Sequence, residues 1–373
     1  MNDFKLLGIK DEFSKALDDV GIVSPTEIQR QVIPLLLEGN TDLVGQAQTG
    51  TGKTVAFGLP LLHKINSEKD CVQALILCPT RELGQQVAKQ LFRFTKYSAK
   101  IFTEAVYGGS QISKQIANLT RTTHIVVATP GRLIDLVDRN SVDLTYVKTV
   151  VLDEADEMLS MGFKKELDKI LAILPELQNR WLFSATISHG VQRIINEHIN
   201  SKAHKITVSQ NNLVNVRIDH KFILCDTNEK VFIILKFLNS VKLKRGIIFC
   251  RTRKDAKDLA SRLIDKNIST DAIHGDLLQK ERDKVMRKFK RSLLSVIVAT
   301  DIVARGIDVP DLAYVIHYQL PDKDEYYTHR SGRTARAGKN GVSLALVSSY
   351  EMKKIRNYEK KLKIVFSKLK LMR

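Results

Sequence analysis

Short hydrophobic runs alternate with longer amphipathic stretches along the whole chain. The runs span 74–78, 125–128, 150–152 and 181–183 in the first half, and 222–224, 247–250, 296–298, 314–316 and 343–347 in the second. Hydrophobic runs without alternating polar residues are typical of parallel strands in sheets that helices cover on both faces. The pattern therefore predicts an α/β fold with open parallel sheets.

The polar segment 209–212, Ser-Gln-Asn-Asn, interrupts this pattern near the middle of the chain. A length of 373 residues allows two domains, or at most three. We expect a first domain over 1–208, a linker over 209–215 and a second domain over 216–373. Two open sheets joined in this way leave a cleft at the carboxyl ends of their strands, where such sheets bind ligands.

Composition excludes several classes of protein. Hydrophobic residues make up 43% of the chain, which is enough to fill ordinary cores. No hydrophobic run approaches ~18 residues, and the N-terminus lacks a hydrophobic signal core, so we expect a cytoplasmic protein without a membrane segment. Cys71, Cys78, Cys225 and Cys250 form no C-x-x-C pair, and we expect reduced, buried thiols.

Positive charge is concentrated in the second half. Residues 1–210 hold 24 Lys and Arg against 23 Asp and Glu, whereas residues 211–373 hold 35 against 18. This excess favours a polyanionic partner, although a solvated lysine-rich surface would have the same composition. Part of the excess lies in the tail 351–373, where Met352, Ile355, Tyr358 and Leu362 predict an amphipathic helix docked on the second domain.

A glycine-containing loop follows the hydrophobic pair Leu43-Val44 and has the sequence Ala47-Gln48-Thr49-Gly50-Thr51-Gly52-Lys53-Thr54. Glycines let backbone N–H groups surround phosphate oxygens, Lys53 can reach the β- and γ-phosphates, and the Thr54 hydroxyl can ligate Mg²⁺. The usual pattern opens with Gly where this chain has Ala47, so a Gly-rich turn is the alternative. The strand-loop-helix context favours the phosphate loop.

An acidic cluster, Asp153-Glu154-Ala155-Asp156, directly follows the hydrophobic run 150–152. Alone, such a cluster is more often a solvated helix start. In the same sheet as a phosphate loop, Asp153 fits the acid that holds Mg²⁺, and Glu154 is placed to orient or deprotonate a water.

A basic segment, His329-Arg330-Ser331-Gly332-Arg333-Thr334-Ala335-Arg336, lies in the second half. Arginines brought to a γ-phosphate from a separate domain stabilise transition-state charge. A surface that binds nucleic-acid phosphates is the alternative, and the segment alone does not separate the two.

Together and in order, these motifs resemble those of the DEAD-box RNA helicases of helicase superfamily 2. Further matches are the Q motif ending at Gln29, Pro79-Thr80-Arg81-Glu82-Leu83, Gly108-Gly109, Thr129-Pro130-Gly131-Arg132, Ser184-Ala185-Thr186, 248–252, the pair Gln279 and Arg282, and 299–308. The resemblance covers nearly the whole chain, and the phosphate loop has the family form that begins with Ala. It implies two tandem RecA-like open parallel-sheet domains joined by a short linker.

The resemblance implies an ATP and Mg²⁺ site with assigned residues. Cofactor-binding residues would be Phe4, Thr26, Gln29, Gln48, Thr49, Gly50, Thr51, Gly52, Lys53, Thr54, Gly306 and Asp308, with Gln29 reading adenine and Phe4 stacking on it. Mg²⁺ would be held by Thr54 and Asp153, partly through water. Catalytic residues would be Lys53, Asp153, Glu154, Arg333 and Arg336, and Asp156, Ser184, Thr186 and His329 would couple the domains.

The resemblance also implies contacts to an RNA backbone. They would come from Pro79, Thr80, Arg81, Gly108, Gly109, Thr129, Pro130, Gly131 and Arg132, and from Arg251, Thr252, His274, Gly275, Gln279, Arg282, Thr300 and Asp301. Amides, hydroxyls and arginines suit phosphates and 2′-OH groups and do not read base edges. From the pattern alone, His274 between Ile273 and Gly275 is better explained as a core residue.

The implied activity is RNA-stimulated ATP hydrolysis coupled by domain closure to local unwinding of short RNA duplexes and to RNP remodelling. A nucleotide-gated RNA clamp and a DNA translocase are the competing functions. We expect a monomer whose partners are RNA and possible ribosomal or RNA-decay proteins.

Overall fold

The structure, a computed structural model, describes residues 3–48, 50–208, 217–301, 312–322, 324–335 and 339–370. It divides into two compact units, Met1–Gln210 and Asn211–Arg373. The expected linker 209–215 lies outside the described residues, so the domain boundaries stay predictions.

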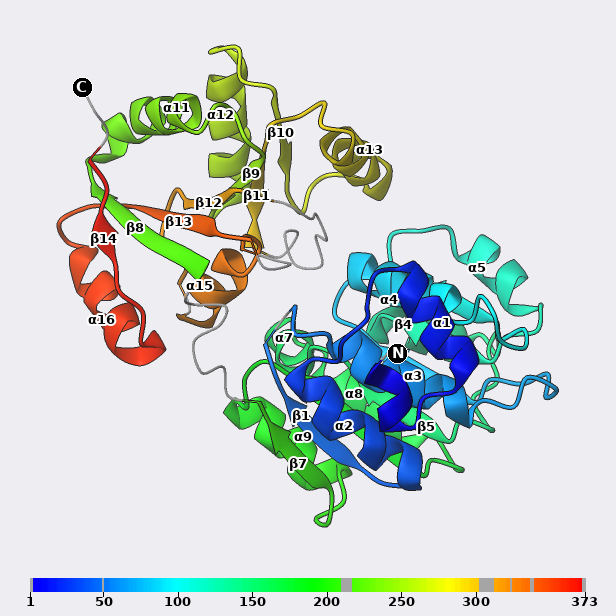
Figure 1. Ribbon diagram of the computed structural model, residues 1–373. Coiled ribbons are helices and arrows are strands. Elements are labelled where there is room, and N and C mark those ends of the chain that lie inside the picture. Colours follow the sequence, from blue (N-terminus) through cyan, green and yellow to red (C-terminus); the bar gives the residue numbers. More distant parts are fainter. Residues whose placement is uncertain are drawn as a thin grey trace. The chain divides into compact units, whose positions relative to one another are not determined.

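The first unit contains a parallel sheet in the order β3-β4-β2-β5-β6-β1-β7 (Figure 1). Its strands are β1 (Leu43–Gln46), β2 (Ala74–Leu77), β3 (Thr103–Val106), β4 (Ile125–Ala128), β5 (Thr149–Leu152), β6 (Asn179–Ser184) and β7 (His204–Thr207). Its helices are η1 (Asp3–Leu7), α1 (Asp11–Asp19), α2 (Glu27–Glu38), α3 (Lys53–Lys64), α4 (Arg81–Phe94), α5 (Ile112–Leu119), α6 (Pro130–Asp138), α7 (Ala155–Ser160), α8 (Lys164–Ala172) and α9 (His189–His198).

Successive residues of each central strand point into two different hydrophobic cores. In β2, Ile76 packs into the core that α1 to α4 cover, whereas Leu75 and Leu77 pack into the core beneath α6 to α9. This alternation explains why the strands are hydrophobic throughout, because both faces of the sheet are buried.

The second unit repeats the same strand order, β10-β11-β9-β12-β13-β8-β14, and all its pairings are parallel. Its strands are β8 (Ile218–Leu224), β9 (Gly246–Cys250), β10 (Thr270–Ile273), β11 (Val296–Thr300), β12 (Tyr314–His317), β13 (Gly341–Val347) and β14 (Ser367–Lys368). Its described helices are η2 (Thr227–Glu229), α11 (Lys230–Ser240), α12 (Arg253–Ile264), α13 (Gln279–Lys290), α15 (Asp324–Ser331) and α16 (Met352–Leu362). The prediction of open parallel-sheet α/β architecture is confirmed in both units.

Two further predictions can be compared with the structure. The tail forms α16, which docks on the second unit through the buried residues Ile355 and Tyr358, as expected. All four cysteines are free, but Cys71 is only partly buried, so the expectation of buried thiols holds for the other three.

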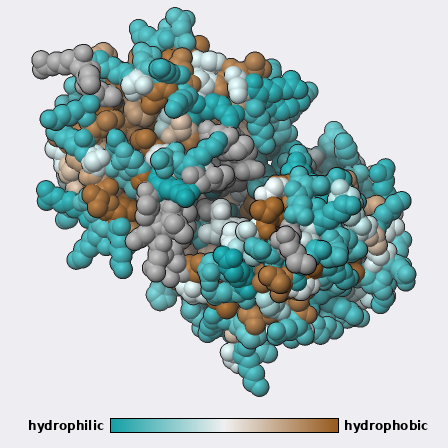
Figure 2. All heavy atoms as spheres, viewed as in Figure 1, coloured by the Kyte–Doolittle hydropathy of each residue, from teal (hydrophilic) through white to brown (hydrophobic). Residues whose placement is uncertain are grey.

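Hydrophilic side chains cover most of the visible surface, and hydrophobic ones appear as scattered patches (Figure 2). No helix among the described residues is long and hydrophobic enough to cross a bilayer.

Candidate active site

Three adjacent strands of the first sheet end at the predicted nucleotide and coupling residues. Strands β5, β6 and β1 are neighbours, with Gln46 of β1 in register with Ser184 of β6. Asp153 follows β5, Ser184 ends β6, and the phosphate loop follows β1. Parallel pairing therefore brings residues that are more than 100 positions apart to one edge of the sheet.

The phosphate loop turns directly into α3. Gly50 and Gly52 have φ values of 83° and 90°, which L-residues rarely adopt, and α3 begins at Lys53. The Lys53 side chain is buried, and its Nζ donates to the Ala47 carbonyl oxygen at 2.9 Å. Gln48 accepts a hydrogen bond from the Thr51 hydroxyl, and Thr54 lies half-buried in the first turn of α3. Thr49 lies outside the described residues.

The Q-motif residues at the start of α2 hold the phosphate loop. Gln29 Nε2 donates to the Gly52 carbonyl oxygen at 3.0 Å, and Thr26 Oγ1 donates to the Thr51 carbonyl oxygen at 2.8 Å. The Thr26 N–H donates to Gln29 Oε1 at 2.8 Å. Since Gln29 is only 2% exposed, its side chain contacts the loop that would bind phosphate, in addition to any contact with a base.

Phe4, which the resemblance places on the adenine ring, is fully buried within η1. It belongs to the hydrophobic core that also contains Ile9, Phe13 and Leu17. The ring would have to lose part of this covering to stack on a base, so its role stays a prediction.

Asp153 is a buried carboxylate beside the phosphate loop. It is 2% exposed, and its Oδ1 has no hydrogen-bond partner among the described residues. Burial raises the pKa of Asp153 to about 7, Lys53 opposes this increase, and the neighbouring Glu154 adds to it. Glu154 has φ 53° and ψ 52°, an uncommon left-handed conformation immediately before α7. Such strain is found preferentially at functional sites.

The predicted coupling residues of the first unit form one hydrogen-bonded group. Asp156 Oδ2 accepts from both the N–H and the hydroxyl of Thr186, each at 2.9 Å. The Ser184 hydroxyl accepts from the Asp156 N–H and donates to the Thr186 carbonyl oxygen at 2.7 Å. The loop after β6 is therefore tied to the first turn of α7.

The predicted RNA residues of the first unit follow the other neighbouring strands, β3, β4 and β2. Pro79, Thr80 and Arg81 come after β2, Gly108 and Gly109 after β3, and Thr129, Pro130, Gly131 and Arg132 after β4. Thr80 Oγ1 caps α4 by accepting from the Leu83 N–H, and the Arg81 guanidinium lies 4.4 Å from the centre of the Tyr107 ring. Arg132 donates to Gln115 Oε1 at 2.8 Å and to the Ser110 carbonyl oxygen at 3.1 Å.

In the second unit the predicted RNA residues follow the equivalent strands β10, β11 and β9. His274 and Gly275 come after β10, Thr300 ends β11, Asp301 follows it, and Arg251 and Thr252 come after β9. Thr252 Oγ1 caps α12 by accepting from the Asp255 N–H at 3.0 Å. Gln279 begins α13, and Arg282 donates to the Gly275 carbonyl oxygen at 3.1 Å. His274 is buried, with 3% of the residue exposed, so the structure agrees with a core position and its contact with RNA stays a prediction.

Asp301 is engaged inside the second unit. Its carboxylate accepts two hydrogen bonds from Arg330, including Nη2 to Oδ2 at 2.6 Å. The Arg330 side chain is 1% exposed, and it also donates to the Gln319 carbonyl oxygen. The resemblance assigned roles to Arg333 and Arg336 and none to Arg330, whose partner Asp301 lies 29 residues away in the sequence. Asp301 is therefore paired with a buried arginine, which indicates a structural role, and its contact with RNA stays a prediction.

The remaining predicted residues lie at or near α15, or outside the described residues. His329 is half-buried near the end of α15, and Arg333 is buried just after that helix. Gly306, Asp308 and Arg336 lie outside the described residues, so no geometry is assigned to them.

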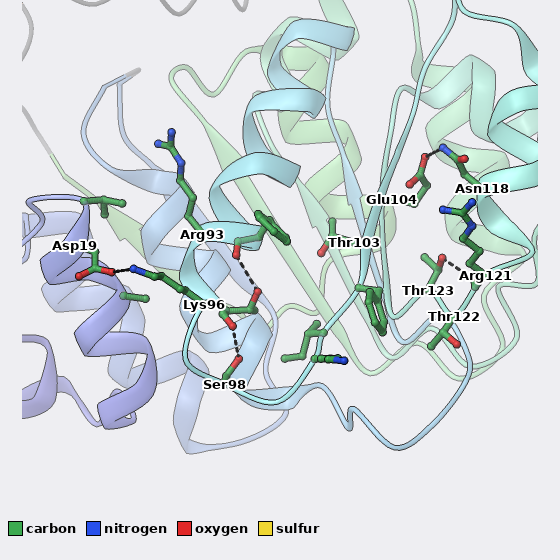
Figure 3. A pocket seen from close by; sticks show the side chains of 17 residues that line it. Asp19, Arg93, Lys96, Ser98, Thr103, Glu104, Asn118, Arg121, Thr122 and Thr123 are labelled. Atoms are coloured by element: carbon green, nitrogen blue, oxygen red, sulfur yellow. Dashed lines mark hydrogen bonds and ion pairs between the residues drawn. The ribbon is translucent and has the colours of Figure 1, made fainter.

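A surface cavity of about 1290 Å³ lies away from these residues, at the amino ends of β3 and β4 (Figure 3). Asp19 and Lys96 pair with each other across it, and Asn118 Nδ2 donates to Glu104 at 2.8 Å. None of the predicted site residues lines this cavity.

Two family models match the chain: DEAD/DEAH box helicase over residues 26–194 and Helicase conserved C-terminal domain over residues 229–338. The chain is 41% identical to the ATP-dependent RNA helicase CshA of Listeria monocytogenes, over 96% of this chain and 68% of that protein. It is similar to the solved structure of S. cerevisiae Dbp5 bound to RNA and ADP BeF3, with 28% identity, a TM-score of 0.88, and coverage of 99% and 96%. A second solved structure, Mss116p bound to ssRNA and AMP-PNP, is 30% identical with a TM-score of 0.86, over 97% of this chain and 78% of that one.

Proposed function

We propose, on the premise that this chain belongs to the DEAD/DEAH box helicase family and is an ATP-dependent RNA helicase, that it opens short RNA duplexes by closing its two units around ATP and RNA. One observation carries the proposal. In the first unit, the predicted nucleotide and coupling residues follow β5, β6 and β1, and the predicted RNA residues follow β3, β4 and β2, so that one edge of the sheet holds these groups side by side.

The residues at the phosphate loop fit a nucleoside triphosphate with Mg²⁺. The unpartnered, buried Oδ1 of Asp153 and the Lys53 ammonium lie beside glycines that leave backbone N–H groups free to face phosphates. Thr54 and Asp153 would hold Mg²⁺, partly through water, and the ion would supply Lewis-acid neutralisation of phosphate charge. Gln29 and Thr26 both donate to carbonyl oxygens of the loop, so a change in the loop on nucleotide binding would also change the contacts of these two side chains.

Hydrolysis of the terminal phosphoanhydride bond would use groups from both units. Glu154, held by its backbone at the end of β5, would orient the attacking water and accept its proton. Arg333 and Arg336 would stabilise the charge on the transferring phosphoryl group once the second unit approaches. Asp156, Ser184, Thr186 and His329 would link this approach to RNA binding, and Gly306 and Asp308 would complete the nucleotide contacts.

The RNA would be held by its backbone, without sequence preference. Helices follow the carboxyl ends of β2 and β9, and their N-termini are capped by Thr80 and Thr252, where backbone N–H groups attract phosphates. A strand bent by the closed units would no longer pair with its complement, so a few base pairs open. Differential affinity of ATP for the closed state would drive the cycle. We place this activity in RNA metabolism in the cytoplasm, in a monomer that ribosomal or RNA-decay proteins direct to its targets.

Glu154→Gln tests the proposed chemistry. Turnover should fall by about 10²–10⁴-fold, because the amide cannot accept a proton, while ATP and RNA titrations stay unchanged. Glu176→Gln, an exposed carboxylate remote from the loop, is the matched control. RNA-stimulated turnover at the wild-type rate in Glu154→Gln would refute the assignment.

Strand displacement separates unwinding from clamping. The wild-type protein should release a strand from a short RNA duplex during ATP turnover and should not do so with the equivalent DNA duplex. Stable RNA binding with turnover but no strand release would identify a nucleotide-gated clamp.

A further inference from the structure

Helix α13 presents four cationic side chains on one face. Lys280, Lys284, Arg287 and Arg291 are spaced i, i+4, i+7 and i+11, and all four are exposed. At ~100° per residue these positions fall within an arc of about 60°. The opposite face carries Val285 and Phe289, which are buried in the core of the second unit. The hydrophobic face anchors the helix, and the cationic face is left to solvent.

These four cations are not neutralised by neighbouring acids. None of them takes part in an ion pair within the part of the chain that the structure describes, whereas Lys288 of the same helix lies 3.7 Å from Asp271. The two acids of α13 keep their charge but lie near its start, where they accept hydrogen bonds from neutral donors: Glu281 from the Leu278 N–H, and Asp283 from Gln279 Nε2. Neither forms an ion pair with any of the four cations among the described residues. The stripe therefore has a net charge of about +4, concentrated on one helix face.

We propose that this α13 stripe binds the phosphate backbone of RNA that extends beyond the residues gripped by the core of the helicase. The helix begins at Gln279, and Arg282 in its first turn donates to the carbonyl oxygen of Gly275, so α13 starts among the predicted RNA contacts. It packs against β10, the edge strand on that side of the sheet, where Figure 1 shows it at the end of the second unit. An RNA leaving the core on this side meets the stripe.

The dimensions of the stripe suit several nucleotides. From Lys280 to Arg291 the helix rises about 17 Å, which at ~3.4 Å per phosphate corresponds to roughly five nucleotides of a strand. A row of lysine and arginine side chains without interleaved aromatics offers no surface on which bases stack, so phosphates are its expected ligands. The stripe would strengthen binding of long or partly duplex RNA without adding sequence preference. This inference rests on the proposed function, because it extends the same RNA site.

The chain offers a matched control on the other side of the same unit. Helix α16 and the residue after it carry Lys353, Arg356, Lys360 and Lys363, which are also exposed, on one face, and without an ion pair among the described residues. This helix packs with Phe366 and residues of β13, towards the opposite edge of the sheet from β10. Removal of four charges there changes the net charge equally but leaves the α13 stripe intact.

The experiment compares two quadruple variants of the full chain. One replaces Lys280, Lys284, Arg287 and Arg291 with Gln; the other replaces Lys353, Arg356 and Lys360 with Gln and Lys363, whose φ is 53°, with Asn. Circular dichroism confirms that each variant is folded. Binding is measured by fluorescence anisotropy with a non-hydrolysable ATP analogue, using a short single-stranded RNA and the same RNA extended by a duplex at its 5′ or 3′ end.

The wild-type protein and the α16 variant should bind one of the extended RNAs more tightly than the short RNA, and the α13 variant should lose this gain. If all four contacts form, the plot of log affinity against log salt concentration should have a slope shallower by about 3 for the α13 variant than for the wild-type protein. Between 50 and 200 mM salt the variant would then lose roughly 50-fold less affinity than the wild-type protein. Equal losses in the two variants, or a gain retained by the α13 variant with both extensions, would overturn the proposal. Failure of the short RNA to stimulate wild-type ATP turnover would instead refute the proposed function.

Discussion

The buried pair between Asp301 and Arg330 gives a prediction that separates structure from RNA binding. The Arg330 guanidinium is 1% exposed and depends on the Asp301 carboxylate for two of its hydrogen bonds. Asp301→Asn keeps the size of the side chain but removes its charge and turns one acceptor into a donor that faces the guanidinium. A buried cation is then left without its counter-ion.

Breaking a buried pair in this way costs about 3–5 kcal/mol. Since the Asp301 side chain is 18% exposed, water can replace part of the lost contact, and we expect the lower end, ~3 kcal/mol. Replacing both partners, Asp301→Asn with Arg330→Met, should recover part of this loss, because Met can pack against Phe249, whose ring lies 5.1 Å from the guanidinium.

The chain allows the two units to be followed separately. Its single tryptophan, Trp181, is buried in β6 of the first unit, so urea unfolding monitored by fluorescence reports that unit, whereas circular dichroism reports both. Asp301→Asn should make the second unit unfold at a lower urea concentration, which circular dichroism detects. The fluorescence transition of the first unit should stay at the same urea concentration. A loss of RNA affinity with less than ~1 kcal/mol of destabilisation would contradict the structural role and restore Asp301 as an RNA contact.

Two further outcomes follow from individual contacts. Gly52→Ala would place a Cβ against Gln29 Nε2, so affinity for a fluorescent ATP analogue should fall at least ~10-fold. Gly50→Ala, also at positive φ but with open space around the new Cβ, measures the backbone strain alone. An equal loss in both variants would exclude the clash with Gln29 as the cause. Burial lowers the pKa of His220, which is hydrogen-bonded to Tyr327, to about 4, so below pH ~6.5 the unfolded chain binds a proton that the folded unit does not. The free energy of unfolding of the second unit should therefore fall by up to ~3 kcal/mol between pH 6.5 and 4, as measured by urea unfolding. His220→Leu should reduce this pH dependence, and the same dependence in the variant would contradict the role of His220.

Hydrophobic pattern predicted the central strands and missed the edges. All nine runs identified in the sequence correspond to strands, and the pair Leu43-Val44 lies in β1, but β3, β7, β10 and β14 were not identified. These four are the outer strands of the two sheets, and they are largely half-buried or exposed. An edge strand has a neighbour on one side only and needs no continuous hydrophobic run, so its sequence resembles that of a loop.

Local motifs located the candidate site but could not describe its contacts. The resemblance identified Gln29 and the glycine-containing loop pattern identified Gly52, while their hydrogen bond depends on how α2 packs against the loop, which the sequence does not encode locally. The pairing of Asp301 with Arg330 is likewise a tertiary contact. Asp301, which its motif assigns to RNA, therefore accepts hydrogen bonds from Arg330 within the protein. Buried partners of this kind are found only once the fold brings the strands together.

The common strand order of the two units explains why the predicted RNA contacts occur in equivalent pairs. Thr80 follows the second strand of the first sheet and Thr252 the second strand of the other, and each caps the next helix with its hydroxyl. The first strand differs, because β1 leads into the phosphate loop, whereas β8 ends near the buried Cys225. A repeated scaffold thus presents two similar surfaces to a repeating backbone, while the phosphate loop is present in the first unit alone. In the proposed function, where the second unit supplies the arginines, hydrolysis would require both units, and a polymer long enough to span both surfaces would be the ligand that brings them together.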